Sequence, residues 1–360
     1  MKKHRLGFVG AGRVADVHYA AIQALRPRAE LAAFCDIRAE AVKARSIEWN
    51  VPGYASIDKM LDCKELDGVI VLLPHDVHLA ACSEAAVRGI PILLEKPIAL
   101  TVAEADEIIS VCEENNAMLL VGQTGLFHPD FEKTVEIIQS GLIGKPVFAQ
   151  AKSTQWLHFK PWDFRRSKAK TGGGCWMDCA GHLVYRLREI FGEVVEIDGM
   201  VANLLRPEME GEDHASAVLK FNCGALAQIT VSYGLKLPGY EDDWPQGCEQ
   251  SLLISGDRGA VDYNLCPTSR LRLFSEVEGG RAPVLNGWSE QGRTEPFATS
   301  FTYQLKHFLD CAETGRSPRS SGRDALATLK VLTSLYEKLG IGNVSESASV
   351  NGPQLASSLI

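Results

Sequence analysis

The sequence lacks a long apolar run, a dense cluster of basic residues and a regular spacing of cysteines. A membrane-spanning helix needs about 20 predominantly apolar residues in succession, and no segment approaches that length. Residues 1–5 (MKKHR) lead directly into a short strand rather than into the apolar region of a signal peptide. We therefore expect a cytoplasmic protein that does not bind membranes.

Charge and cysteine content exclude further classes of protein. The formal net charge is -8, and no basic run is dense enough to displace counterions from a phosphate backbone, so we expect no nucleic-acid partner. The 10 cysteines are scattered, mostly inside apolar runs, which predicts buried free thiols in a reducing compartment. The examples are Cys35, Cys82, Cys112, Cys223 and Cys311.

The order of apolar segments predicts two domains. The chain has 360 residues, which is too long for one typical core. Up to about residue 125, short apolar strands alternate with helices; beyond it, strands alternate with period two, as in the hairpins predicted within residues 215–233 and 251–263. We predict an α/β fold: a Rossmann domain with a doubly wound parallel sheet (1–125) and an α+β domain with a large, mostly antiparallel sheet (126–360).

The second domain is expected to bind substrate and to form a homo-oligomer, a dimer or a tetramer. An antiparallel sheet with helices on one face commonly leaves its other face to a second subunit. Residues 238–250 are rich in proline, glycine and acidic residues, and we predict that they form a long loop over the site.

A dinucleotide-binding turn follows the first strand. Residues 10–15 (GAGRVA) match the Rossmann fingerprint with alanine in the third glycine position. Gly10 permits a tight turn, Gly12 lets the backbone approach a pyrophosphate, and Ala15 allows close packing of the helix on the strand. Arg13 and Val14 open the helix, whose free N–H groups face the phosphates.

The second strand ends in Asp36, about 20 residues further on, where a carboxylate binds the ribose hydroxyls and repels a 2′-phosphate. This predicts NAD as the cofactor. Arg38 could reach a 2′-phosphate, which keeps NADP possible, or it could be a solvated helix residue. Further cofactor contacts are predicted where later strands end, although His78 also fits a packed position at a helix start. They are Leu73, Pro74, His75, His78, Glu95, Lys96 and Gln123.

The apolar run at residues 92–97 (ILLEKP) delivers charged groups at the carboxyl end of a parallel strand, where open α/β sheets bind ligands. Taken alone, Lys96 could be an ordinary surface lysine. A tight redirection of the chain here would favour a cis bond between Lys96 and Pro97.

Residues 171–182 (TGGGCWMDCAGH) form the second informative stretch. Asp178 and His182 are four residues apart and are expected to share one helix face, where the carboxylate would orient the imidazole and raise its basicity. The alternatives are an ordinary surface pair, or a zinc site with Cys175 and Cys179. Zinc is disfavoured because a structural site closes four ligands and no second cluster supplies the remainder, so we predict no metal.

Aromatic and cationic residues crowd the segment just before these glycines. Stacking rings and cationic donors could hold a sugar ring that carries a carboxylate or a phosphate. Solvated loop charges are the alternative. The residues are Trp156, His158, Trp162, Arg165, Arg166 and Lys170.

The ordered set of the glycine-rich turn, Pro74, the Glu-Lys-Pro tripeptide and the triple glycine with Asp178 and His182 resembles the Gfo/Idh/MocA oxidoreductase family over almost the whole chain. The resemblance implies an NAD(P)-dependent dehydrogenase that transfers a hydride between nicotinamide and a secondary alcohol or ketone of a sugar, sugar acid or cyclitol. It also implies that Lys96, Asp178 and His182 are the catalytic group. Together with Trp162 and Arg165, they are the predicted substrate-binding residues.

In the expected mechanism, His182 or Lys96 takes the hydroxyl proton, the other donates a hydrogen bond to the developing alkoxide, and Asp178 orients the imidazole or a substrate hydroxyl. A lysine with its usual pKa of about 10.4 is a poor base at neutral pH. We expect desolvation and the positive nicotinamide ring to lower the pKa of Lys96 to about 7–8.

Two departures from the family pattern leave the substrate open. Leu126 stands where many members have an arginine, and Tyr185 where many have an aspartate. Two other functions also remain open: an NAD-dependent glycosidase of the same fold, and a non-catalytic sensor of sugar or nucleotide. Retention of Lys96, Asp178 and His182 together argues against the sensor, which needs no proton transfer.

Overall fold

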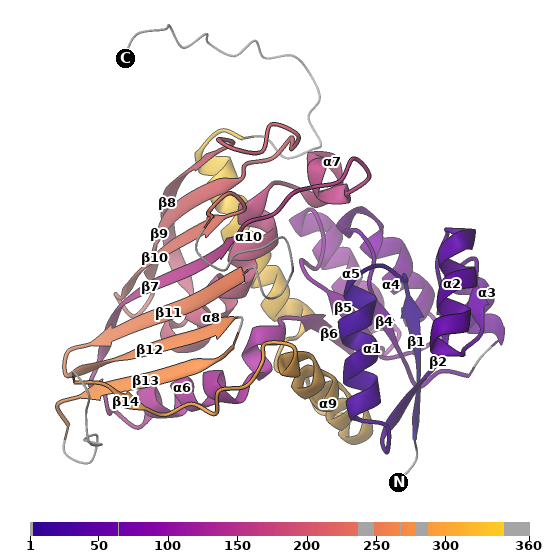
Figure 1. The fold of residues 1–360 in the computed structure, drawn as a ribbon, viewed down its shortest axis with the longest axis horizontal. Helices are drawn as coiled ribbons and strands as arrows, with labels where there is room; N and C mark the ends of the chain where they lie inside the picture. The colour runs from indigo at the N-terminus through magenta and orange to yellow at the C-terminus, as the bar shows by residue number, and fades with distance from the viewer. Residues whose placement is uncertain (1–2, 64, 237–247, 267, 278–286, 342–360) are drawn as a thin grey trace, which may run out of the picture.

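The computed structural model describes residues 3–63, 65–236, 248–266, 268–277 and 287–341. Two sheets organise them, and helices lie between the two sheets (Figure 1). Within these ranges, no helix is both long enough and apolar enough to cross a membrane.

The first sheet has six parallel strands in the order β3-β2-β1-β4-β5-β6, as the predicted doubly wound architecture requires. Helices cover both faces, which explains why β4 and β6 are buried along their whole length. The strands are β1 (His4–Val9), β2 (Ala29–Cys35), β3 (Gly53–Tyr54), β4 (Gly68–Val71), β5 (Ile92–Glu95) and β6 (Leu119–Gly122). The helices are α1 (Val14–Ala24), α2 (Ala39–Trp49), α3 (Ile57–Cys63), α4 (His78–Ala86) and α5 (Val102–Glu114), with 3-10 turns η1 (His75–Val77) and η2 (Thr124–Phe127).

The second sheet has eight strands in the order β14-β13-β12-β11-β7-β10-β9-β8, and every pair is antiparallel except β7 with β10. The predicted hairpins are confirmed as β9 with β10 and β11 with β12. The strands are β7 (Pro146–Gln155), β8 (Val194–Ala202), β9 (His214–Phe221), β10 (Leu226–Ser232), β11 (Cys248–Gly256), β12 (Gly259–Cys266), β13 (Arg270–Ser275) and β14 (Ser289–Glu290). Of the loop predicted at 238–250, residues 238–247 lie outside the described residues, and the rest begin β11.

Helices pack on one face of this sheet. In β9, buried and exposed residues alternate strictly, because one side of the strand meets the helices and the other does not. The helices are α6 (Pro129–Gln139), α8 (Gly181–Phe191) and α10 (Gly322–Lys338); between β7 and α8 the chain forms η3 (Phe164–Arg166), α7 (Lys168–Thr171) and a π-helical turn, η4 (Trp176–Ala180).

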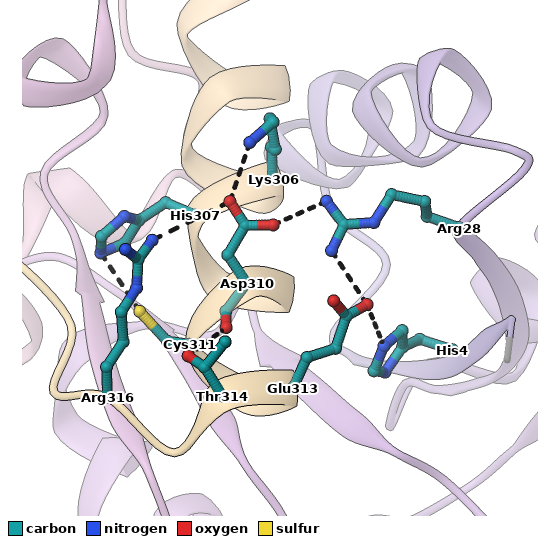
Figure 2. Close-up of polar contacts among 9 residues, drawn as sticks. All are labelled: His4, Arg28, Lys306, His307, Asp310, Cys311, Glu313, Thr314 and Arg316. Atoms are coloured by element: carbon teal, nitrogen blue, oxygen red, sulfur yellow. Dashed lines mark hydrogen bonds and ion pairs between the residues drawn. The ribbon is translucent and has the colours of Figure 1, made fainter. Parts of the chain in front are cut away.

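The last two helices return to the first sheet. Helix α9 (Thr299–Thr314) packs on α1, and α10 begins at the predicted capping box of Ser321 and Asp324 and packs on α5. Figure 2 shows how α9 is fixed: Arg28 donates to Asp310 at 2.7 Å and to Glu313 at 2.9 Å, and Glu313 also contacts His4 at 2.9 Å. The C-terminal helices therefore serve the nucleotide-binding part as well.

The sequence predicts that the cysteines are free and buried. Two of them form a disulfide, and a third is free but exposed. Cys248 and Cys266 are joined by a disulfide, because the β11 and β12 pairing brings their Cα atoms to 6.1 Å. Cys223 is exposed in the turn between β9 and β10. The other named cysteines, Cys35, Cys82, Cys112 and Cys311, are free and buried.

The triple glycine makes room for the chain's own packing. Gly172 has φ 76°, a conformation that favours glycine. A Cβ on Gly173 would lie 2.0 Å from Tyr336 Oη, and one on Gly174 would lie 1.9 Å from the Glu212 carbonyl oxygen. The approach that these glycines permit is therefore to Tyr336 and to the Glu212 backbone.

Gly174→Ala is expected to lower the free energy of unfolding by about 3 kcal/mol or more, because backbone atoms of Glu212 cannot rotate aside. Urea denaturation measures this. As a control, Gly141→Ala meets no atom within 4 Å but has φ 77°, so only backbone strain of about 1 kcal/mol should remain. Equal losses in the two variants would contradict the packing argument.

Candidate active site

Lys96 and Asp178 form an ion pair where the two halves of the chain meet. Lys96 follows β5, its bond to Pro97 is cis as predicted, and its Nζ donates to the Asp178 carboxylate and, at 2.7 Å, to the Asp178 carbonyl oxygen. Tyr233, just after β10, donates its hydroxyl to the second carboxylate oxygen. The two paired side chains are only 16% and 18% exposed. Sequence reasoning missed Tyr233, because nothing local relates it to Asp178.

His182 lies in the first turn of α8, directly after η4, and its partner is not the predicted one. Its Nδ1 lies 3.1 Å from Gln123 Oε1, and no hydrogen bond links it to Asp178 among the described residues. The predicted hydrogen-bonded pair is therefore wrong. Asp178 lies in a π-helical turn, whose wider i to i+5 spacing rotates it away from the face that an α-helix would share with His182. Gln123, predicted as a cofactor contact, orients the imidazole instead.

The local charges set the protonation states of these groups. Burial opposes the Asp178 carboxylate, but Lys96 and Arg165 outweigh burial and hold its pKa well below the usual value. Burial likewise opposes the Lys96 ammonium, but Asp178 raises the pKa of Lys96 above its usual value. Burial and the charges of Lys96 and Arg186 hold the pKa of His182 well below its usual value. Lys96 is thus charged and His182 is neutral.

Burial is the largest single effect on the pKa of Lys96 and opposes the ammonium, but contact with the Asp178 carboxylate, together with Cys179 and Glu95, outweighs burial. The lowering expected from the nicotinamide ring stays a prediction.

Glu95 is bound to the helix after the glycine-rich turn. Its Oε1 lies 2.8 Å from Nε2 of His18, a fully buried residue of α1, and its Oε2 accepts from the backbone N–H of Lys96 at 3.3 Å. Glu95 therefore fixes the end of β5 relative to α1. His18 was not singled out in the sequence, because a histidine on an apolar helix face is usually a core residue.

The glycine-rich turn has the features that a dinucleotide requires. Gly10 has φ 100°, and a Cβ there would lie 2.6 Å from the Leu72 carbonyl oxygen, whereas a Cβ on Gly12 would meet nothing within 4 Å. Gly12 thus leaves open the approach that a pyrophosphate needs. Arg13 and Val14 lie at the start of α1, and Leu73 and Pro74 follow β4 across the sheet.

Asp36 lies at the end of β2 and accepts from the backbone N–H of Ala11 at 3.0 Å. Arg38 donates to both carboxylate oxygens, with Nε–Oδ1 at 3.0 Å and Nη2–Oδ2 at 2.9 Å. Neither alternative for Arg38 foresaw this pairing. It keeps the carboxylate at the ribose position and engages the guanidinium that could bind a 2′-phosphate.

The two histidines after β4 are both buried. Burial lowers the pKa of His75 to about 3, so it is neutral, and its ring lies 5.5 Å from that of Phe164. His78 has no exposed surface, and its ring nitrogens lie 3.0 Å from the Leu73 carbonyl and 3.2 Å from the Ile98 carbonyl. The cofactor contact predicted for His78 is not supported, because its ring bridges the two strand ends instead.

The aromatic and cationic cluster before the glycines divides into separate groups. Trp156 and His158 pack with Arg206, whose guanidinium lies 4.4 Å from the Trp156 ring. Trp162 is 81% exposed and Lys170 is exposed, while Arg166 donates to the Glu208 carbonyl at 3.0 Å. Of the cluster, only Arg165 acts on the pKa of Asp178.

No metal site is apparent within the described ranges, where no three His, Cys, Asp or Glu residues converge to hold an ion. Two of the residues considered as zinc ligands contact other side chains. His182 contacts Gln123, and Cys179 accepts from Gln155 at 3.4 Å.

Asp178→Asn is expected to lower the free energy of unfolding at pH 7 by about 3 kcal/mol, because it leaves the Lys96 ammonium buried without a counter-charge. Since the pKa of Asp178 is depressed in the folded state, its contribution is present above the unfolded pKa of about 3.9 and is lost as the pH falls below it. In urea denaturation, the difference in free energy of unfolding between the wild type and Asp178→Asn should therefore be about 1 kcal/mol smaller at pH 3 than at pH 7.

The matched control is Glu193→Gln, which removes an exposed carboxylate from Arg188; Arg188 keeps its bonds to the Asp324 carbonyl and Thr328, so the change should cost less than about 1 kcal/mol at either pH. A gap for Asp178→Asn that does not change with pH would assign the loss to packing rather than to charge.

Comparisons with known proteins agree with this geometry. Residues 4–123 match the model of an oxidoreductase family with an NAD-binding Rossmann fold, and residues 131–262 match the GFO/IDH/MocA C-terminal domain. The chain is 32% identical over 346 residues to the rhizopine catabolism protein MocA of Rhizobium meliloti, covering 94% of this chain and 96% of that protein. It is 26% identical to the myo-inositol 2-dehydrogenase of Thermotoga maritima, covering 90% and 93%.

A solved oxidoreductase from Agrobacterium radiobacter, in complex with NAD+, L-tartaric acid and magnesium, shares the fold with a TM-score of 0.82 at 20% identity, covering 94% of this chain and 97% of that one. Both halves of the described site thus lie within segments that match the family models. The chain belongs to the Gfo/Idh/MocA oxidoreductase family, whose Rossmann fold binds NAD.

Proposed function

We propose that this enzyme oxidises a secondary alcohol of a sugar, sugar acid or cyclitol with NAD, or catalyses the reverse reduction. The observation that carries the proposal is the neutral imidazole of His182 within the field of the charged Lys96–Asp178 pair, at the carboxyl ends of the parallel strands. The similarity to the myo-inositol 2-dehydrogenase of Thermotoga maritima supports the substrate class.

His182 is the general base in this mechanism. Its Nδ1–H donates to Gln123 Oε1, which leaves the lone pair of Nε2 free to take the hydroxyl proton. Bound NAD supplies the hydride acceptor. Asp178 stays a carboxylate, held by Lys96 and Tyr233, and needs no proton change.

Lys96 is the hydrogen-bond donor. An ammonium has three N–H donors, and two of them point to the carbonyl and carboxylate oxygens of Asp178. The third is available to the oxygen on which negative charge develops as the proton and the hydride leave. Because Asp178 keeps Lys96 charged, Lys96 is poorly suited to accept the proton.

NAD is the preferred cofactor in this proposal. Asp36 directly follows β2, the position at which the dinucleotide fingerprint predicts a ribose-binding carboxylate, and its pairing with Arg38 supports NAD over NADP.

The function is tested by incubating the purified protein with NAD or NADP and a panel of inositols, aldoses, sugar acids and nucleotide sugars, while NADH is followed by absorbance. We expect NADH from at least one sugar or cyclitol, with NAD the better cofactor. Turnover of an added aryl glycoside without net NADH would instead indicate the glycosidase, and nucleotide binding without turnover would indicate the sensor.

His182→Asn serves as the mechanistic variant in the same assay, with an expected loss in kcat of about 10²–10⁴ and little change in NAD binding. Since a base is active when deprotonated and the pKa of His182 is lowered, wild-type kcat/KM should persist to below pH 6 and fall only at more acidic pH.

We also propose that the open face of the second sheet forms a homo-oligomer. This face exposes apolar side chains along several strands, among them Met200 at 79%, Val195 at 60% and Val218 at 49%. Light scattering after size exclusion should give a dimer or tetramer, and Met200→Lys should shift it toward monomer. A wild-type monomer at micromolar concentration would contradict this.

A further inference from the structure

Asp163 and Arg165 form a closed pair at the end of the site that faces the nucleotide-binding turn. Asp163 Oδ1 accepts from Arg165 Nε at 2.9 Å and from its backbone N–H at 3.0 Å, and Asp163 Oδ2 accepts from Arg165 Nη2 at 2.6 Å. Both side chains are more than four-fifths buried. Such a bidentate pair occupies the N–H edge of the guanidinium that would otherwise bind a carboxylate or phosphate.

The pair lies close to the reacting groups. The guanidinium of Arg165 is 4.9 Å from the centre of the Phe159 ring, and that ring is 5.3 Å from the ring of Tyr233, whose hydroxyl binds Asp178. The charge of Arg165 helps lower the pKa of Asp178, second only to Lys96 among the charges. On the other side, the charge of Arg13 acts on Asp163.

Among the described residues, the two cations nearest the reacting carboxylate are each paired with a carboxylate: Lys96 with Asp178, and Arg165 with Asp163. Arg186, whose charge also acts on His182, is fully buried and donates to the His182 carbonyl and to Gln250, while its Nη1 has no hydrogen-bond partner. An anionic substrate would therefore meet the carboxylates of Asp178 and Asp163 beside these two cations, and it would have to displace Asp163 to bind the guanidinium of Arg165.

We propose that the Asp163–Arg165 pair restricts the site to uncharged polyols, with Asp163 as the residue that excludes substrates bearing a carboxylate or phosphate. The inference rests on the proposed function and narrows its substrate class to neutral sugars and cyclitols. The pairing with Asp163 keeps the guanidinium of Arg165 from binding the substrate, and the ring of Phe159 packs against that guanidinium.

The test is Asp163→Asn, which keeps the shape of the side chain but removes its charge and so releases Arg165 to bind an anion. Kinetics compare a neutral sugar that yields NADH with its uronate, which differs only by a carboxylate. Wild type should have a kcat/KM at least about tenfold lower for the uronate, and the variant should raise the uronate-to-neutral ratio about tenfold, mainly through KM. Added salt should weaken this gain.

Two further variants separate the causes. The gain should vanish in the double variant Asp163→Asn with Arg165→Gln, which has no guanidinium to release. Glu193→Gln, which makes the same charge change at the distant Arg188 pair, should leave the ratio unchanged. If Asp163→Asn fails to fold, the uronate-to-neutral ratio of Arg165→Gln still decides, whatever its overall rate. An unchanged ratio would support the inference, and a ratio lower than in wild type would overturn it by showing that Arg165 already binds the anion.

The outcomes distinguish this inference from the proposed function. A wild-type preference for the uronate, or an unchanged ratio in a folded Asp163→Asn variant, would overturn the inference while NADH formation upholds the function. If Asp163→Asn raises KM for NAD and leaves the uronate-to-neutral ratio unchanged, the inference is also overturned, because the Asp163–Arg165 pair would then act on cofactor binding. NADH from neither class of substrate would overturn both.

Discussion

The ion pair between Lys96 and Asp178 is the contact on which the site depends. Taking both charges out of water is costly, and their attraction offsets that cost only when the remaining donors and acceptors are satisfied. Here the second carboxylate oxygen accepts from Tyr233, and the ammonium also donates to the Asp178 carbonyl. The pair joins a strand end of the first sheet to the turn beside the second, so the geometry of the site is also the geometry of the junction.

The turn that carries Asp178 is held from behind. The buried carboxylate of Glu212 accepts from the backbone N–H of Gly174 at 3.0 Å and of Trp176 at 2.9 Å, and from the hydroxyl of Tyr336 at 2.8 Å. These contacts satisfy N–H groups that the first turn of a helix leaves without partners. Gly173 and Gly174 have no room for a side chain, because Tyr336 and Glu212 lie so close to them. Helix α10, which carries Tyr336, thereby connects the site to the layer that covers the first sheet.

The parts of the fold that local patterns determine were predictable from the sequence. The glycine-rich turn, the buried parallel strands, the two capping boxes, the two hairpins and the cis bond before Pro97 all follow from neighbouring residues. The predictions that failed concern contacts between residues that are far apart in the sequence. The π-helical turn that separates Asp178 from His182 is set by packing. Gln123, Tyr233 and His18 each contact a partner from a distant part of the chain. The disulfide likewise depends on the strand register of β11 and β12, which the spacing of cysteines does not reveal.

One electrostatic arrangement explains why a base and a charged donor can work side by side. Asp178 stabilises the ammonium of Lys96, and the positive charge so fixed, together with that of Arg186, disfavours a second positive charge on His182. The pKa values of Lys96 and His182 are therefore shifted in opposite directions, as acid and base partners in active sites require. Burial does most to keep His182 neutral, and the direct effect of the Asp178 carboxylate, which favours a charged imidazole, is smaller than those of burial, Lys96 and Arg186. The carboxylate thus keeps Lys96 charged without itself exchanging a proton.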